Sequence, residues 1–224
     1  MTMDIKYSSI IEKFGNEYGS SPAYHYYAIL SKLSTYFNDS VIVDLGTLYG
    51  NSAAALSYNK TNIVYTYDIE HREEAADVFK KEEFQNIKYI VGNCIEDNWF
   101  GMAMLWKNRM VESKSDKEIF LSTVESKSDK EIFLSSKLIF MDVDPHNGVQ
   151  EDKVLNFLIS NNWKGILVCD DIGLGREKGK ENAHPAMRDW WNSIELPKYD
   201  ISKNYFAAGT GTGVVCFDGQ EVIF

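Results

Sequence analysis

The amino-acid sequence predicts a doubly wound α/β fold, in which a mostly parallel sheet has helices on both faces. Three observations support this prediction. Short apolar runs of strand length alternate with segments of helical periodicity, a glycine-containing turn joins the first run to the next helical segment, and aspartates follow later runs. Parallel strands need helical crossovers of this kind. The chain has 224 residues and no evident linker, so we expect a single domain spanning 1–224.

The predicted elements follow one another in a regular order. Helical spacing of aromatic and aliphatic residues predicts one or two helices in an N-terminal helical segment, 1–40. Strands and helices should then alternate at 41–45, 52–58, 63–67, 73–84 and 87–91, and again at 138–141, 151–160 and 165–169. The last two runs, 199–202 and 213–217, flank a glycine-rich loop with no room for a helix. They therefore predict an antiparallel pair at one edge of the sheet.

An insertion at 101–136 contains a tandem duplication, because VESKSDKEIFLST at 111–123 is followed by VESKSDKEIFLSS at 124–136. Thirteen steps of about 100° do not return to the same helical face, so the two copies should occupy different environments. We interpret the segment as an insertion in a surface connection, where added length costs little. The alternatives are a lid over a site or a contact in a homo-oligomer.

The composition limits the classes of partner. Lysine and arginine total 23 against 33 acidic residues, which gives 23 − 33 = −10 and argues against binding of nucleic acid or anionic lipid. A small molecule is the expected partner. The three cysteines are an odd set that suits free thiols, and no apolar stretch reaches membrane-spanning length. We therefore expect a cytoplasmic protein.

Four aspartates follow two of the predicted strands: Asp142 and Asp144 come after 138–141, and Asp170 and Asp171 come after 165–169. In open α/β sheets, ligands bind at the carboxyl ends of the strands, so these side chains should face a site. Like charges gathered there repel one another unless a cation neutralises them. Carboxylate oxygens suit Mg²⁺, which the sequence therefore predicts at this position.

The turn DLGTLYG at 44–50 leads from the first strand of the alternating series into a helix. Gly46 and Gly50 permit a tight turn and close approach of a ligand to the backbone. Asp68 ends the next strand, 68 − 50 = 18 residues after the second glycine, near the offset at which an acidic side chain binds a ribose diol. Glu70 is an alternative for that role. The pattern predicts a nucleoside-containing cofactor, although the GxxxG spacing does not favour a nicotinamide dehydrogenase.

These motifs resemble class I S-adenosylmethionine-dependent methyltransferases over residues 40–217. VIVDLGTLYGNSA is similar to their first motif, VYTYDIE to the acidic motif of the next strand, and KYIVGNCIED to the segment that passes the adenine. The resemblance implies a Rossmann-like seven-stranded sheet with an antiparallel C-terminal hairpin, and S-adenosyl-L-methionine as the cofactor. By position, the implied cofactor-binding residues are Asp44, Gly46, Thr47, Gly50, Ser52, Asp68, Asn93 and Asp142.

LIFMDVDPHNG and ILVCDDIG resemble the metal-binding motifs of Mg²⁺-dependent sugar O-methyltransferases from macrolide and aminocoumarin biosynthesis. The resemblance implies Asp142, Asp170 and Asp171 as metal ligands. Asp144 would be the catalytic base, and His146 is a second candidate catalytic residue. Relatives commonly have histidine directly after the second aspartate, whereas here Pro145 intervenes.

The predicted function is Mg²⁺-assisted O-methylation of a hydroxyl on a small sugar-like or glycosylated metabolite. A catechol-like phenol is the alternative acceptor. Two further alternatives are methylation of nitrogen or carbon without a metal, and a non-catalytic cofactor-binding or scaffold protein of the same fold. His25, Trp190 and Trp191 are aromatic residues that would line an acceptor pocket or belong to the core or an interface.

Overall fold

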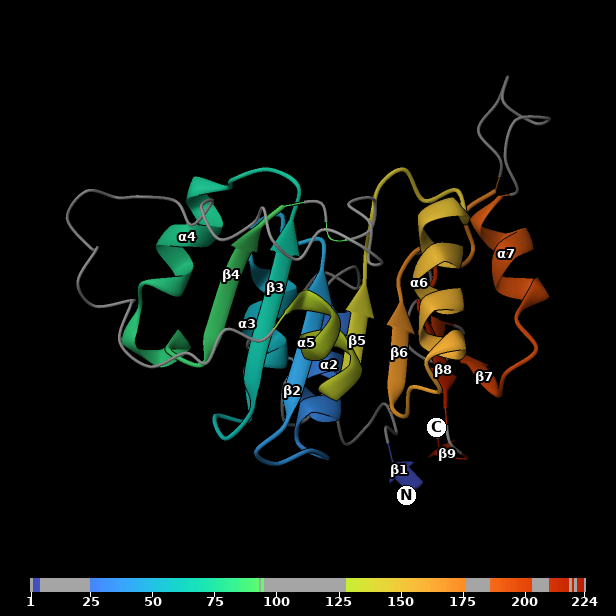
Figure 1. The fold of residues 1–224 in the computed structure, drawn as a ribbon, viewed down its shortest axis with the longest axis horizontal. Coiled ribbons are helices and arrows are strands. Elements are labelled where there is room, and N and C mark those ends of the chain that lie inside the picture. The colour runs from blue at the N-terminus through green and yellow to red at the C-terminus, as the bar shows by residue number, and fades with distance from the viewer. Residues whose placement is uncertain are drawn as a thin grey trace.

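The structure is a computed structural model that describes residues 2–4, 25–92, 94, 128–175, 186–202, 210–217, 219 and 221–223. A seven-stranded sheet lies at its centre (Figure 1), with strand order β4-β3-β2-β5-β6-β8-β7. The strands are β2 (Val41–Leu45), β3 (Ile63–Asp68), β4 (Ile87–Val91), β5 (Ser136–Met141), β6 (Ile166–Cys169), β7 (Lys198–Asp200) and β8 (Gly213–Cys216).

The strand pairing confirms the predicted fold class. β2 pairs in parallel with both β3 and β5, β3 with β4, and β5 with β6, whereas β8 is antiparallel to β6 and to β7. The chain runs outward from β2 through β3 to β4 and then returns to the other side of β2 at β5. This is the topological switch point of a doubly wound sheet, where ligands bind beyond the carboxyl ends of the strands.

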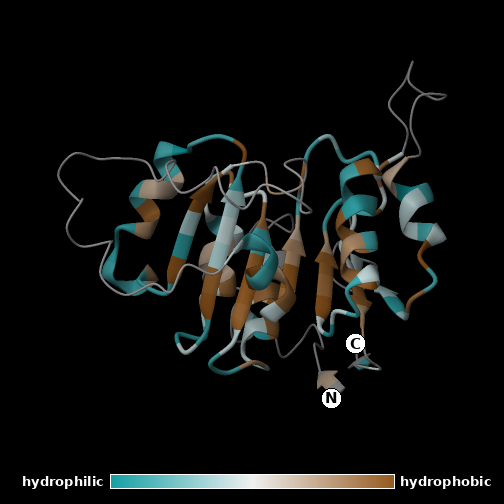
Figure 2. Ribbon diagram, viewed as in Figure 1, coloured by the Kyte–Doolittle hydropathy of each residue, from teal (hydrophilic) through white to brown (hydrophobic). Residues whose placement is uncertain are grey.

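Helices cover both faces of the sheet, and each face has its own core (Figures 1 and 2). Alternate strand residues divide between the cores; Ile42 packs into the first and Val43 into the second. The first core includes residues of α2 (His25–Ser34) and α3 (Asn51–Leu56), and Phe79 of α4 (Glu73–Phe79) packs against it. The second core includes residues of α5 (Asp129–Ser135), α6 (Val149–Ser160) and α7 (Met187–Ser193).

The helix predicted at 73–84 is interrupted. α4 ends at Phe79, Lys81 is extended with ψ 145°, and a short 3₁₀ helix, η2, follows at Glu82–Phe84. Phe79 and Phe84 both pack against the first core, yet five positions on one helix would point them about 140° apart. The break lets both rings reach the same core.

A strand that the sequence did not predict lies in the N-terminal segment. β1 (Thr2–Asp4) pairs in parallel with β9 (Glu221–Ile223), and Met3 is fully buried in the first core. α2 is the helix of this segment that the structure describes, while 5–24 lies outside the described residues. Three-residue strands contain too few positions to show an alternating pattern, so no local pattern indicates this pair.

The insertion is described only from Ser128 onward, so 101–127 lies outside the described residues. The end of the second copy forms α5. Ser128 and Glu131 form a reciprocal capping box, and Phe133 is fully buried in the second core. β5 then begins at Ser136. The lid, the oligomer contact and the single-domain organisation remain predictions.

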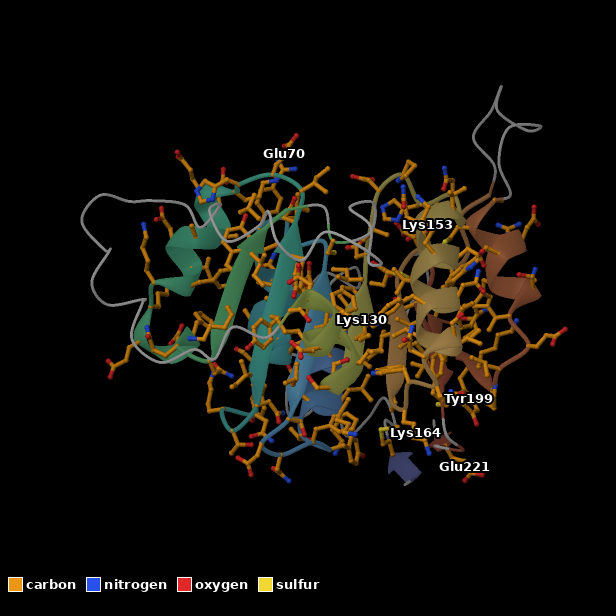
Figure 3. All side chains as sticks on the ribbon, in the orientation of Figure 1. Glu70, Lys130, Lys153, Lys164, Tyr199 and Glu221 are labelled. Carbon is orange, nitrogen blue, oxygen red and sulfur yellow. The ribbon has the colours of Figure 1, made fainter. Side chains whose placement is uncertain are left out.

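The parallel strands β2 to β6 all end at one edge of the sheet, which we call the carboxyl edge (Figure 1). Figure 3 shows Glu70 just beyond β3 at this edge, and Lys164 and Glu221 at the opposite edge. No helix in the described part of the chain is both long and apolar enough to cross a membrane. Cys94, Cys169 and Cys216 are free thiols.

Candidate functional site

Two acidic groups lie at the carboxyl edge on either side of the switch point. The glycine-turn group consists of Asp44, Thr47, Thr66 and Asp68, from the ends of β2 and β3. The trio consists of Asp142, His146 and Asp171, from the segments that follow β5 and β6. Because β2 and β5 are neighbours in the sheet, the two groups lie side by side.

Gly46 fixes the contact between these groups. Its φ of +97° is unfavourable for other residues, and a Cβ there would lie 1.8 Å from the carbonyl oxygen of Asp142. Asp142 in turn donates its backbone N–H to the carbonyl of Leu45 at 2.9 Å. Gly50 also has positive φ, +83°, and a Cβ there would lie 2.8 Å from the Phe79 ring. The sequence thus allows the turn to lie directly against the backbone that carries Asp142.

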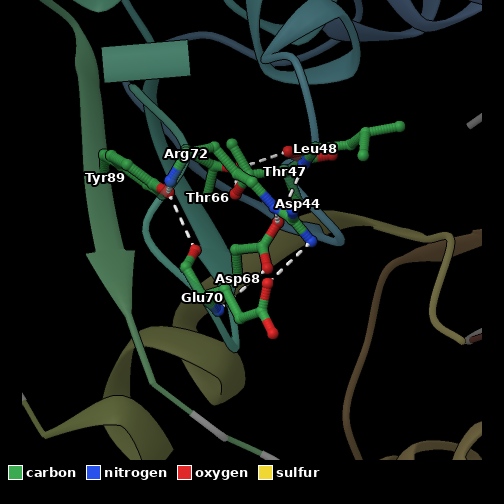
Figure 4. A network of polar contacts seen from close by, with 8 residues as sticks. All are labelled: Asp44, Thr47, Leu48, Thr66, Asp68, Glu70, Arg72 and Tyr89. Atoms are coloured by element: carbon green, nitrogen blue, oxygen red, sulfur yellow. Dashed lines mark hydrogen bonds and ion pairs between the residues drawn. The ribbon is translucent and has the colours of Figure 1, made fainter. Parts of the chain in front are cut away.

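Asp44 is completely buried in the glycine-turn group (Figure 4). The hydroxyl of Thr66 donates to Asp44 Oδ2 at 2.5 Å, and the Thr47 and Thr66 hydroxyls are 2.6 Å apart. Asp44 Oδ1 has no hydrogen-bond partner among the described residues. Burial raises the pKa of Asp44 to about 7, although the Thr66 and Ser52 hydroxyls act in the opposite direction. A donor or cation that reached Asp44 would therefore be strongly favoured.

Asp68 is held from several sides (Figure 4). Its Oδ2 accepts the backbone N–H of Leu48 at 2.9 Å, and its Oδ1 accepts that of Glu70 at 3.1 Å. Arg72 Nε is 3.8 Å from the same Oδ2, and Arg72 Nη2 is 3.3 Å from Glu70 Oε2. A carboxylate has about four acceptor sites, so Asp68 can still accept bonds from a ligand while it fixes the turn.

The trio brings one imidazole between two carboxylates. His146 Nε2 is 3.7 Å from Asp142 Oδ1, His146 Nδ1 is 3.4 Å from Asp171 Oδ2, and one ligand atom from each residue lies within 4.8 Å of the others. His146 and Asp171 have positive φ, 50° and 58°. Such conformations are uncommon outside glycine and cluster at functional sites. All three side chains are partly buried, so a small ion could reach them from solvent.

Negative charge accumulates around the trio. Burial raises the pKa of Asp142, an effect that Asp171, Asp44 and Asp144 increase and His146 opposes. Burial also raises the pKa of Asp170 to about 7, with Asp142 and Asp171 adding to the shift. Both carboxylates therefore resist ionisation, chiefly because they are buried and further because their neighbours are also acidic. A bound cation would relieve this repulsion.

The structure brings together part of the predicted metal set. Asp142 and Asp171 lie in the trio, whereas Asp170 Oδ1 accepts a hydrogen bond from the Thr212 hydroxyl at 2.9 Å. Asp144, the predicted base, has a 92% exposed side chain whose Oδ1 is 3.3 Å from His146 Nε2. His146, predicted as catalytic, lies within the group that could hold a metal.

The predicted cofactor-binding residues are placed as follows. Asp44, Gly46, Thr47, Gly50 and Asp68 form or adjoin the glycine turn, and the Ser52 hydroxyl acts on Asp44 from the first turn of α3. Asp142 lies against that turn. Asn93 lies outside the described residues.

Several site residues were not found from the sequence. Thr66 and Thr212 hold Asp44 and Asp170, and Tyr89 accepts the backbone N–H of Arg72 at 2.9 Å. Each contact joins segments well separated along the chain, so no local pattern indicates it.

The two tryptophans belong to the second core. Trp190 and Trp191 are 4% and 6% exposed, and a Cβ at Gly148 would lie 2.6 Å from Trp190 Cβ. Of the two alternatives, the structure therefore favours a core role over an acceptor pocket. The side chain of His25 lies outside the described residues, although its backbone begins α2.

Comparison with known proteins places the fold. No family model and no curated protein matches the sequence. Among solved structures, an O-methyltransferase from Bacillus cereus in complex with SAH is 13% identical, with TM-score 0.53 and coverage of 94% of this chain and 90% of that one. The SAH-bound Podospora anserina methyltransferase PaMTH1 is 13% identical, with TM-score 0.51 and coverage of 94% and 85%. The chain has the class I methyltransferase fold.

A further structure of this methyltransferase fold is a provisionally assigned caffeoyl-CoA O-methyltransferase from Staphylococcus aureus. It is 13% identical, with TM-score 0.52 and coverage of 95% of this chain and 92% of that one. The seven-stranded Rossmann-like sheet and its antiparallel C-terminal hairpin, which the sequence resemblance implied, are both confirmed.

Proposed function

We propose that this chain is an O-methyltransferase that moves the methyl group of S-adenosyl-L-methionine to a hydroxyl of a small sugar-like or glycosylated metabolite, with Mg²⁺ as the assisting ion. The observation that carries the proposal is the direct contact of the Gly46 backbone with Asp142. It makes a nucleoside-binding turn and a cation-binding group adjacent. A methyl donor on one and a hydroxyl on the other would lie within reach of each other.

In this proposal the glycine-turn group binds the cofactor. Asp68 accepts hydrogen bonds from the ribose hydroxyls through its remaining acceptor sites, since the Leu48 and Glu70 N–H groups hold its carboxylate in place. Asp44 accepts the cofactor's ammonium group, which supplies the donor that Asp44 Oδ1 lacks among the described residues. The side chains of Leu48 and Ile69, 50% and 66% exposed at the same turn, offer apolar cover for the adenine. Asn93 is a proposed adenine contact by resemblance.

The trio fits a divalent cation because it offers two carboxylates and an imidazole within 4.8 Å. Such an ion would supply Lewis-acid chemistry that lowers the pKa of a hydroxyl and so makes it easier to deprotonate. Asp142 and Asp171 would hold it, with Asp170 the third ligand by sequence resemblance. Asp144 is the proposed base, since its exposed carboxylate can accept a proton and release it to solvent. His146 holds Asp144 from 3.3 Å.

A catechol-like phenol is the second candidate acceptor. The likeness of fold to the Staphylococcus aureus protein assigned to caffeoyl-CoA favours it. A phenol ionises near pH 10 and so needs less help from a cation than a sugar hydroxyl does. Methyl transfer to a phenol should therefore depend less on Mg²⁺.

The cofactor half of the proposal is tested by calorimetric titration of S-adenosylhomocysteine into the wild-type chain, Asp68→Asn and Glu70→Gln. We expect the dissociation constant to rise at least about tenfold for Asp68→Asn, because one charge-assisted hydrogen bond is worth roughly 1.5 to 3 kcal/mol. Glu70→Gln is the matched control, because Glu70 is 64% exposed. A larger loss for Glu70→Gln would assign the ribose to that residue instead.

The transfer half is tested with methyl-labelled S-adenosylmethionine and a panel of glycosylated and catechol acceptors, with Mg²⁺ or with a chelator. Label on a sugar hydroxyl that disappears in chelator supports the proposal. Undiminished transfer in chelator contradicts assistance by a metal. Tight cofactor binding with no transfer to any acceptor would indicate a non-catalytic protein of this fold.

A further inference from the structure

The ligand set of the trio differs from the all-aspartate set that the sequence resemblance implied. The positive φ of His146, one residue after Pro145, places its imidazole between Asp142 and Asp171, at 3.7 and 3.4 Å. Asp170 is instead engaged by the Thr212 hydroxyl. The atoms that converge are therefore two carboxylate oxygens and one ring nitrogen.

This donor set bears on the identity of the ion. Mg²⁺ is a hard cation that takes oxygen ligands and retains its waters, whereas imidazole nitrogen suits first-row transition ions. Replacing one carboxylate by an imidazole also removes one negative charge from the ligand set. Both changes weaken the site for Mg²⁺ relative to ions such as Co²⁺ and Zn²⁺.

We infer that His146 is a ligand, and that Asp142, His146 and Asp171 form a two-carboxylate, one-imidazole site selective for first-row transition ions over Mg²⁺. This inference rests on the proposed metal site and refines it. Asp144 then acts as the base without help from His146. The preferred ion is one that, like Co²⁺ or Zn²⁺, readily accepts an imidazole nitrogen as a ligand.

The test measures the dissociation constants of Mg²⁺ and Co²⁺ for the wild-type chain, His146→Asn and the control His71→Asn, whose ring stacks on Tyr89 at 5.9 Å. Any site binds Co²⁺ more tightly than Mg²⁺ to some degree. The inference is therefore tested by how the ratio of the two dissociation constants changes between variants. We expect His146→Asn to lower the Co²⁺ over Mg²⁺ preference at least about tenfold, mainly by weakening Co²⁺. His71→Asn should leave the ratio unchanged.

The visible spectrum of bound Co²⁺ gives a second readout. It should lose its nitrogen contribution in His146→Asn and remain as in wild type in His71→Asn.

A Co²⁺ to Mg²⁺ ratio that is the same in wild type and His146→Asn would overturn the inference. Mg²⁺-stimulated methyl transfer in that case would leave the proposed function standing. Conversely, a ratio that falls in His146→Asn in a protein with no methyl transfer would support the metal site and reject the proposed function.

Discussion

The two acidic groups at the carboxyl edge differ in how their charges are satisfied. In the glycine-turn group, Asp68 accepts two backbone N–H groups and faces Arg72, so the protein supplies its donors before any ligand arrives. In the trio, Asp142 and Asp171 face one imidazole and each other. Burial also raises the pKa of Asp142 and so opposes its ionisation. The first arrangement suits a ligand that brings hydroxyl groups. The second leaves negative charge for a cation to neutralise.

Gly46→Ala should disturb both the glycine-turn group and the trio. Its Cβ would lie 1.8 Å from the Asp142 carbonyl oxygen at a φ of +97°, so the backbone of one group must move. We expect a loss of more than about 3 kcal/mol in the free energy of unfolding, and weaker binding of both S-adenosylhomocysteine and metal. Denaturant unfolding and calorimetry measure these changes.

Gly175→Ala is the matched control, because among the described residues nothing lies within 4 Å of a Cβ placed there. Wild-type stability in Gly46→Ala would show that the contact between the two groups is looser than the structure indicates.

Asp171→Asn should weaken binding at the trio and leave binding at the glycine-turn group nearly unchanged. We expect the metal dissociation constant to rise by about 100-fold, or roughly 2.7 kcal/mol, while S-adenosylhomocysteine binds within about twofold of wild type. Asp170→Asn should have a smaller effect on metal binding, because Asp170 is held by Thr212. Titration of both variants with the same ion compares them, and a larger loss for Asp170→Asn would restore the ligand set implied by the sequence.

Asp44→Asn should change the pH dependence of stability. The pKa of Asp44 is raised from 3.8 to about 7 by burial, so its favourable contribution is complete below the unfolded value and is lost as pH rises through 7. At pH 8 the variant should be more stable than wild type by on the order of 4 kcal/mol, at about 1.4 kcal/mol per pKa unit. Near pH 4 the gap should close.

Urea unfolding at several pH values measures this difference, in which the titration of the other carboxyls largely cancels. The same variant should bind S-adenosylhomocysteine at least about tenfold more weakly. A stability gap that does not vary with pH would contradict the assignment of a raised pKa to Asp44.

Thr212→Val should have the smallest effect. It removes the hydroxyl that donates to Asp170 at 2.9 Å and leaves a buried carboxyl without that donor, which costs about 1 to 2 kcal/mol. Thr212→Ser retains the donor and should behave as wild type in thermal unfolding. Equal losses in the two variants would trace the effect to packing and not to the hydrogen bond.

Most of the sheet could be predicted because its strands are continuous apolar runs. β2 and β4 have the predicted bounds, and β3, β5 and β6 differ by two residues at most at either end. α7 was missed because its segment is short. Trp190 packs against Gly148, which is distant in the sequence, and this contact leaves no helical pattern within the segment itself. Tertiary packing, not local pattern, makes that helix.

The site was predictable in its position and less so in its membership. Strand ends at a switch point locate Asp44, Asp68 and Asp142 without any knowledge of side-chain contacts. The placement of His146 depends on a backbone conformation with φ of 50°, which the residue types alone do not specify. The threonine that holds Asp170 is 42 residues away, at a point where an antiparallel strand returns beside β6.

The contact of Gly46 with Asp142 also has a thermodynamic consequence for the order of events. Because the turn that would hold the cofactor rests on the residue that would hold the ion, ordering of either one by its ligand constrains the other. Linkage then requires reciprocity: the factor by which the ion tightens cofactor binding equals the factor by which the cofactor tightens ion binding. Binding of the ion and binding of the cofactor would therefore be cooperative, and Gly46 would be the point at which the two sites are coupled.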